Sequence, residues 1–173
     1  MWRKMASSAE ALPNTRSALT HLMAQPASSP TLFAGEFRHG IDPKNRITIP
    51  SSWRAPEGGD FYLRIDTTGS FIIAMPPEEF RKIIASVETQ TTASPRERQQ
   101  FIRQFSGGSK ECSADKQGRM VLPPELCEKI GLKGEAVLVG TSERFEIWNP
   151  ERWEATKVAD APNYNNIAAQ LGL

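Results

Sequence analysis

Two short segments of the chain each hold an aspartate and an arginine at a spacing suited to anion recognition. Asp42 stands four residues before Arg46, and Asp115 stands four residues before Arg119. A carboxylate and a guanidinium at this spacing can pair across a tight turn and brace it. Arginine also suits phosphates and guanine edges, because its planar fork donates two parallel hydrogen bonds. The two turns are therefore candidate sites for binding a nucleic acid.

Neighbouring residues support this interpretation. Lys44 lies in the first segment and Lys116 in the second, where an ammonium group could act as a point charge on phosphate. Asn45 stands where the second segment has Gly118, which predicts a left-handed backbone, since Gly prefers that conformation and Asn tolerates it. The alternative is that each Asp–Arg pair only braces its turn at the surface, with a contribution of about 0–1 kcal/mol.

The surroundings of the two segments differ in charge. Arg38 precedes the first segment, whereas Glu111 stands at the matching position before the second. The surface around the first segment is therefore expected to be more basic. We expect the first segment to make the main contact with a nucleic acid.

The two segments belong to an internal repeat. Positions 42 and 115, like positions 46 and 119, are 73 residues apart. The same offset matches residues of the same chemical class over a longer stretch, including Ile47 with Met120, Ile49 with Leu122, Pro50 with Pro123, Gly58 with Gly131, Pro77 with Pro150 and Phe80 with Trp153. A gapless run of matches in one register indicates a duplication.

Each copy predicts short strands followed by a helix. The expected strands are 47–49, 61–65 and 71–75 in the first copy and 120–122, 136–139 and 145–148 in the second. A helix is expected to begin at Pro76-Pro77 and another after Asn149, and a linking helix is expected between Ser94 and Gly107. Since a copy of about 50 residues can bury little core alone, the two copies are expected to share one core.

These residues resemble a known family. An Asp-x-x-x-Arg turn followed by a short strand and a proline is similar to the AbrB-like swapped-hairpin barrel, and two copies in one chain resemble the MraZ family of bacterial transcriptional regulators. The resemblance runs from about residue 33 to residue 153. It implies an α+β, mainly β fold: a duplicated AbrB-like barrel with peripheral helices.

The resemblance also implies a function. Such a protein would be a sequence-specific DNA-binding regulator of the division and cell-wall gene cluster, including its own promoter. It would bind short direct repeats in double-stranded DNA as a ring of identical subunits, such as an octamer, and would be cytoplasmic and nucleoid-associated. The DNA-binding residues would be Arg38, Asp42, Lys44, Arg46, Asp115, Lys116 and Arg119.

The expected organisation has five parts. Residues 1–32 would be a disordered extension, or a mis-assigned start with Met23 as the true beginning. Residues 33–85 and 108–158 would be the two repeats, joined by a linking helix at 86–107 and followed by a C-terminal tail at 159–173.

Composition limits the other functional classes. The formal net charge is +1, so any DNA surface must be a local patch whose affinity is raised by assembly. The two cysteines have no histidine near them to complete a metal site, and the chain has no Gly-rich phosphate loop and no nucleophile elbow. We therefore do not expect the protein to be an enzyme, to bind a cofactor or to have a small-molecule substrate. The sequence contains no run of about 18 apolar residues, the length that would indicate a membrane-spanning helix.

Two other functions stay open at this level. AbrB-like folds also serve as antitoxins, and the segment 161–173, with Tyr164, Ile167 and Leu171, could bind a partner protein. A purely structural ring is the third possibility. The tryptophans Trp53, Trp148 and Trp153 could stack on single strands, but their places beside strand and helix starts favour core or subunit contacts.

Overall fold

The computed structural model describes residues 31–54 and 58–173 of the 173-residue chain. Almost all of the extension expected at residues 1–32, including the alternative start at Met23, lies outside the described residues.

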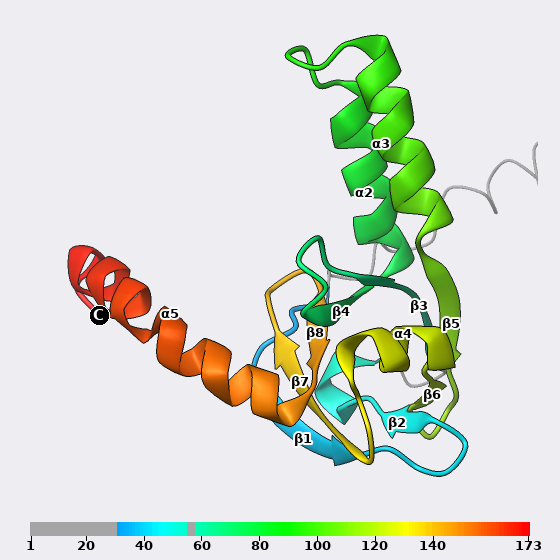
Figure 1. Cartoon of the computed structure of the whole chain (residues 1–173), viewed down its shortest axis with the longest axis vertical. Helices are drawn as coiled ribbons and strands as arrows, with labels where there is room; N and C mark the ends of the chain where they lie inside the picture. The colour runs from blue at the N-terminus through cyan, green and yellow to red at the C-terminus, as the bar shows by residue number, and fades with distance from the viewer. Residues whose placement is uncertain (1–30, 55–57) are drawn as a thin grey trace, which may run out of the picture. The chain divides into compact units, whose positions relative to one another are not determined.

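Eight strands form one antiparallel sheet that curls into a nearly closed barrel (Figure 1). The strands are β1 (Glu36–Gly40), β2 (Arg46–Thr48), β3 (Gly59–Ile65), β4 (Phe71–Met75), β5 (Lys110–Ala114), β6 (Arg119–Val121), β7 (Glu135–Gly140) and β8 (Phe145–Trp148). Their order in the sheet is β1-β7-β8-β4-β3-β5-β6-β2. The mainly β, duplicated AbrB-like barrel with peripheral helices is thereby confirmed.

Every strand of the first copy pairs with a strand of the second copy. The pairs are β1 with β7, β2 with β6, β3 with β5 and β4 with β8. Strands β1 to β4 of the first copy correspond in order to β5 to β8 of the second. If each strand is replaced by its counterpart, the β1–β7 pair becomes the β5–β3 pair, and the β2–β6 and β4–β8 pairs are unchanged. The copies therefore interlock instead of packing as two separate barrels.

The barrel has one shared core. Phe33, Trp53, Phe61 and Phe145 lie against one another in it, with ring centroids 5.3–6.4 Å apart. The indole Nε1–H of Trp53 donates to the carbonyl of Ala34, which satisfies its only polar atom. The expectation that the copies share a core is confirmed.

Four α-helices and one short 3-10 helix complete the described part of the chain. They are η1 (Ser51–Trp53), α2 (Pro77–Glu88), α3 (Pro95–Gly107), α4 (Pro124–Ile130) and α5 (Pro150–Leu171). The helix start expected at Ser94 is confirmed: its hydroxyl accepts from the backbone of Glu97, whose side chain accepts from the backbone of Ser94. Asn149 caps α5 as expected.

The structure adds elements that the pattern analysis did not predict. Strands β1 and β5 precede the two Asp–Arg turns, and α4 follows the second turn. In addition, α5 runs without a break across position 158, where the second repeat was expected to give way to a tail. Pro162 lies inside this helix, so its missing N–H removes a backbone hydrogen bond without ending the helix.

The interlocked pairing leads to a test on fragments. Residues 31–107 and 108–173, expressed separately, should each be largely unfolded, because each half would lose all of its inter-copy strand pairs. Mixing the two should restore β structure, measured by far-UV circular dichroism and amide dispersion in NMR spectra. A stable, well-dispersed spectrum from either half alone would contradict the shared core.

Candidate functional site

The first Asp–Arg turn is built around one carboxylate. Asp42 Oδ1 accepts hydrogen bonds from the backbone N–H groups of Lys44 and Arg46, at 2.8 and 2.9 Å. Asp42 Oδ2 accepts from Nε of Arg46 at 2.7 Å. The backbone closes the turn, since Asn45 N donates to the carbonyl of Asp42 at 2.9 Å. Asp42 therefore fixes the backbone of the turn and the base of the arginine side chain together.

The second turn repeats this geometry. Asp115 Oδ1 accepts from the backbone N–H groups of Gln117 and Arg119, both at 2.9 Å. Asp115 Oδ2 accepts from Nε and Nη2 of Arg119 at 3.0 and 2.9 Å. Gly118 N donates to the carbonyl of Asp115 at 2.7 Å. The expected pairing of aspartate and arginine is thus present in both copies.

Both aspartates are held in the ionised form. The backbone N–H of Arg46 is the main cause that lowers the pKa of Asp42, and the backbone N–H of Arg119 lowers the pKa of Asp115 in the same way. Each carboxylate accepts several donors that only the charged form satisfies fully. At neutral pH each turn therefore holds a permanent carboxylate–guanidinium pair.

The backbone at the apex of each turn is left-handed, as expected. Asn45 has φ 55° and Gly118 has φ 78°. A Cβ at Gly118 would also lie 2.4–2.6 Å from the guanidinium atoms of Arg54. Arg54 thus crosses from the first copy onto the second turn, where its Nη1 donates to the carbonyl of Lys116 at 3.2 Å.

The β2–β6 ladder joins the two turns into one surface. Its register pairs Arg46 with Val121, Ile47 with Met120, and Thr48 with Arg119. The central pair, Ile47 and Met120, is buried in the core. Since side chains alternate across a strand, both arginines lie on the opposite, outward face. This two-stranded ladder with its flanking turns, residues 42–48 and 115–121, is called the basic ribbon below.

Several cations of the basic ribbon remain available to a ligand. Within the described part of the chain, neither Lys44 nor Lys116 forms an ion pair, and neither does Arg54 beside them. With Arg46 and Arg119, five cations stand against the two carboxylates of the turns. The ribbon is therefore a local basic patch on a chain whose formal net charge is only +1.

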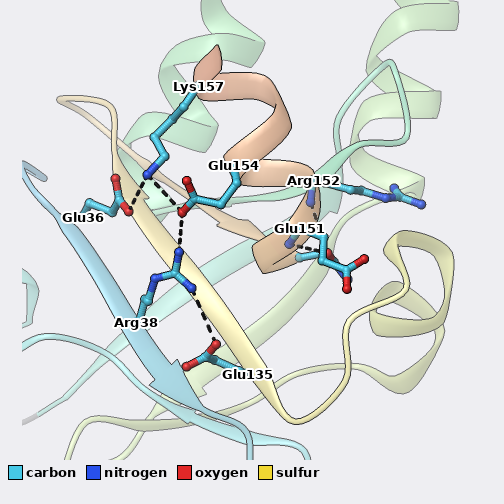
Figure 2. Close-up of polar contacts among 8 residues, drawn as sticks. Glu36, Arg38, Glu135, Glu151, Arg152, Glu154 and Lys157 are labelled. Atoms are coloured by element: carbon cyan, nitrogen blue, oxygen red, sulfur yellow. Dashed lines mark hydrogen bonds and ion pairs between the residues drawn. The ribbon is translucent and has the colours of Figure 1, made fainter. Parts of the chain in front are cut away.

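Arg38, which the sequence analysis expected to bind DNA, lies in a cluster of carboxylates. It lies on β1, where its guanidinium pairs with Glu154 of α5 and lies 3.7 Å from Glu135 of β7 (Figure 2). Lys157 joins the same cluster through Glu36 and Glu154, at 3.3 and 3.1 Å. The sequence could not show that a helix would bring carboxylates against β1. The structure gives Arg38 a place in holding the first turns of α5 on the barrel.

The tryptophans and cysteines contribute to packing. Trp53 and Trp148 are buried, so their rings are not accessible for stacking on a nucleic-acid base. Trp153 packs on Trp148 with ring centroids 5.3 Å apart. Cys112 and Cys127 are free thiols, and burial raises the pKa of both. Arg54 was not among the expected DNA-binding residues, because its contact with Lys116, 62 positions away, forms only in the folded chain.

Comparison with known proteins shows the family. A family model described as "MraZ protein, putative antitoxin-like" matches residues 105–170, a range that includes the second turn. A "Transcriptional regulator MraZ" of Pelotomaculum thermopropionicum is 38% identical over 143 residues, covering 81% of this chain and 95% of the relative. The chain belongs to the MraZ family.

Two further MraZ relatives agree. The "Transcriptional regulator MraZ" of Desulfosudis oleivorans is 40% identical over 147 residues, covering 82% of this chain and the whole relative. That of Lactiplantibacillus plantarum is 33% identical over 140 residues, covering 81% of this chain and 98% of the relative. These names describe regulators and not enzymes, in agreement with the expectation from the sequence.

Within residues 31–54 and 58–173, no helix has the length and apolar character needed to cross a membrane. The same residues hold no group of three or more histidine, cysteine or acidic side chains placed to bind a metal ion.

Replacing Gly118 by Ala in this MraZ-family chain should lower the free energy of unfolding by about 1–2 kcal/mol, because a left-handed backbone is costly for a residue with a Cβ. The Cβ would also push Arg54 off the second turn. The matched control is Asn45→Gly, which should be neutral or slightly stabilising at the equivalent position. Urea unfolding measures both variants, and equal stability for Gly118→Ala and wild type would contradict the strained apex.

Acid should remove the bracing of the turns. Because the folded pKa of Asp115 is lowered, its contribution to stability is present above the ordinary value of 3.8 and is lost as the pH falls through the folded pKa. Asp115→Asn should therefore be less stable than wild type at pH 7, with a difference that shrinks below about pH 4. Asp160→Asn, on the exposed face of α5, is the control. A pH-independent difference would exclude the charged pair as its cause.

Proposed function

We propose that this protein is a sequence-specific DNA-binding transcriptional regulator whose contact surface is the basic ribbon. The observation that carries the proposal is the β2–β6 register, which sets Arg46 and Arg119 on one exposed face. The names of the MraZ relatives support a role in transcription. Double-stranded DNA is the partner that suits a short two-stranded ribbon, because the major groove is wide enough to admit one.

The two turns would act together, with unequal weight. Arg46 uses only Nε on Asp42, which leaves both terminal nitrogens free of protein partners among the described residues. Arg119 uses Nε and one hydrogen of Nη2 on Asp115, which leaves Nη1 and the second hydrogen of Nη2. A bidentate contact with guanine O6 and N7 requires two donors, which both arginines retain. Arg46 is the stronger candidate for base recognition because both of its terminal nitrogens are wholly unused among the described residues. Asp42 and Asp115 would orient the arginines without touching DNA.

The lysines would anchor the ribbon on the phosphate backbone. Lys44 and Lys116 sit one on each turn, at opposite ends of an antiparallel ladder, so they can approach the phosphates on both sides of a groove. Arg54 would add a third backbone contact near the second turn. Arg38 is not part of this proposed interface, because two carboxylates already surround its guanidinium.

Assembly would supply the remaining affinity. One ribbon holds few cations, and linked ribbons on repeated half-sites raise overall affinity without new contacts. We therefore propose a ring of identical subunits, such as an octamer, on short direct repeats at the promoter of the division and cell-wall gene cluster. Such a regulator would act in the cytoplasm, on the nucleoid.

A protein partner is the second candidate function. Tyr164, Ile167 and Leu171 are exposed on α5 at helical spacing, and the matching family model carries the description antitoxin-like. A helix with an apolar stripe can dock in a groove of another protein. Loss of function on replacing these three residues, with DNA binding intact, would favour this candidate.

Replacing Arg46 by Ala should weaken specific DNA binding about ten- to hundredfold, because one bidentate arginine–guanine contact contributes about 1–3 kcal/mol. Arg119→Ala should weaken it less, since its arginine has fewer free donors. Binding to the protein's own upstream DNA and to unrelated DNA would be titrated by fluorescence anisotropy over a range of salt concentrations. The mass in solution should stay unchanged.

Arg103→Ala on the exposed side of α3 is the matched control, because it removes the same charge away from the ribbon. It should leave specific binding within about twofold, the range of an ordinary surface substitution. Equal effects of Arg46→Ala and Arg103→Ala would show that the ribbon is not the contact surface.

A further inference from the structure

Val121 is an unusual residue on the outer face of the ribbon. It is 53% exposed, although both of its neighbours, Met120 and Leu122, are completely buried. Among the described residues, it is the only large hydrophobic side chain that is exposed on a strand. Single exposed apolar side chains are common on protein surfaces, so the feature that bears on function is the place of Val121 among the arginines of the ribbon.

The matching position in the first copy is Thr48, whose side chain also includes a methyl group. Thr48 lies 73 positions before Val121, is exposed, and is flanked by the buried Ile47 and Ile49. Both side chains are β-branched, so each presents a methyl group in a restricted rotamer. The duplicated position therefore carries an exposed β-branched side chain, with at least one methyl group, in both copies.

The ladder places each of these methyl groups beside an arginine. Val121 lies directly opposite Arg46, and Thr48 lies directly opposite Arg119. Side chains on directly opposite residues of an antiparallel ladder have Cβ atoms about 4.5–5.5 Å apart. Each arginine thus has a β-branched neighbour on the same outward face of the ribbon.

We propose that Val121, together with Thr48, is a specificity residue that packs against the 5-methyl group of thymine beside the base bound by the facing arginine. This inference rests on the proposed function and adds to it which bases the ribbon selects. In the major groove the thymine methyl is the apolar group on a base edge, and apolar side chains recognise it by contact. Phosphate contact alone would give no reason for an apolar side chain at this place.

The test removes the methyl group from either side of the contact. The preferred sequence is first selected from a random double-stranded DNA pool with the full-length protein. Each thymine of that sequence is then replaced in turn by deoxyuridine, which lacks only the 5-methyl group. Binding is measured for wild type, Val121→Ala and Thr48→Ser, the last of which removes a methyl and keeps the hydroxyl.

Wild type should bind about fourfold more weakly when a contacted thymine is replaced, the factor that corresponds to one buried methyl group. Val121→Ala should bind the unmodified sequence more weakly and should lose its sensitivity at that thymine. Thr48→Ser should lose sensitivity at a different thymine. Val158→Ala, an exposed valine on α5, is the control and should behave as wild type.

Three results would overturn the inference. The first is specific binding that depends on Arg46 but has no sensitivity to deoxyuridine, which would leave the regulator proposal standing. The second is full deoxyuridine sensitivity in both variants. The third is a fall in the mass of Val121→Ala in solution, which would assign Val121 to a subunit contact. If no sequence is enriched and no DNA is bound, the proposed function itself fails together with this inference.

Discussion

The pairing of β2 with β6 is the interaction on which the rest of the molecule depends. These strands have three residues each, and their central pair, Ile47 and Met120, reaches into the common core. A three-residue strand has little stability of its own, so each strand is ordered mainly by its partner and by the residues buried below it. The same contact that closes the core therefore sets the distance between the two Asp–Arg turns.

The turns themselves are rigid for a local reason. One carboxylate in each turn accepts backbone and side-chain donors at once, and the apex is left-handed. An arginine held in this way loses little freedom when it binds a ligand, which favours recognition of defined groups. Rigid turns on a shared ladder form one preorganised surface, whereas two independent turns would have to be ordered separately.

A second set of charges serves the architecture. Arg38, Lys157 and three glutamates connect β1, β7 and the first turns of α5 (Figure 2). These side chains are partly exposed, so each ion pair contributes little to the free energy of unfolding. The role of the cluster is to set the direction in which α5 leaves the barrel. Basic residues of similar appearance in the sequence thus have different environments: within residues 31–54 and 58–173 Lys44 has no ion-pair partner, while Arg38 is held by carboxylates.

The sequence by itself determined the duplication, the barrel family, the two Asp–Arg turns and the left-handed apex at Asn45 and Gly118. The turns and their left-handed apex depend on local spacing and on backbone preferences, which act over a few residues. The duplication shows as one constant offset of 73 residues, and the barrel family follows from the resemblance of the two repeated motifs. Tertiary structure decided that Arg38 faces Glu154, that Arg54 reaches the second turn, and that Val121 faces Arg46. Each of these contacts joins residues more than 60 positions apart, so it depends on strand register and helix direction, which periodicity within one segment does not encode.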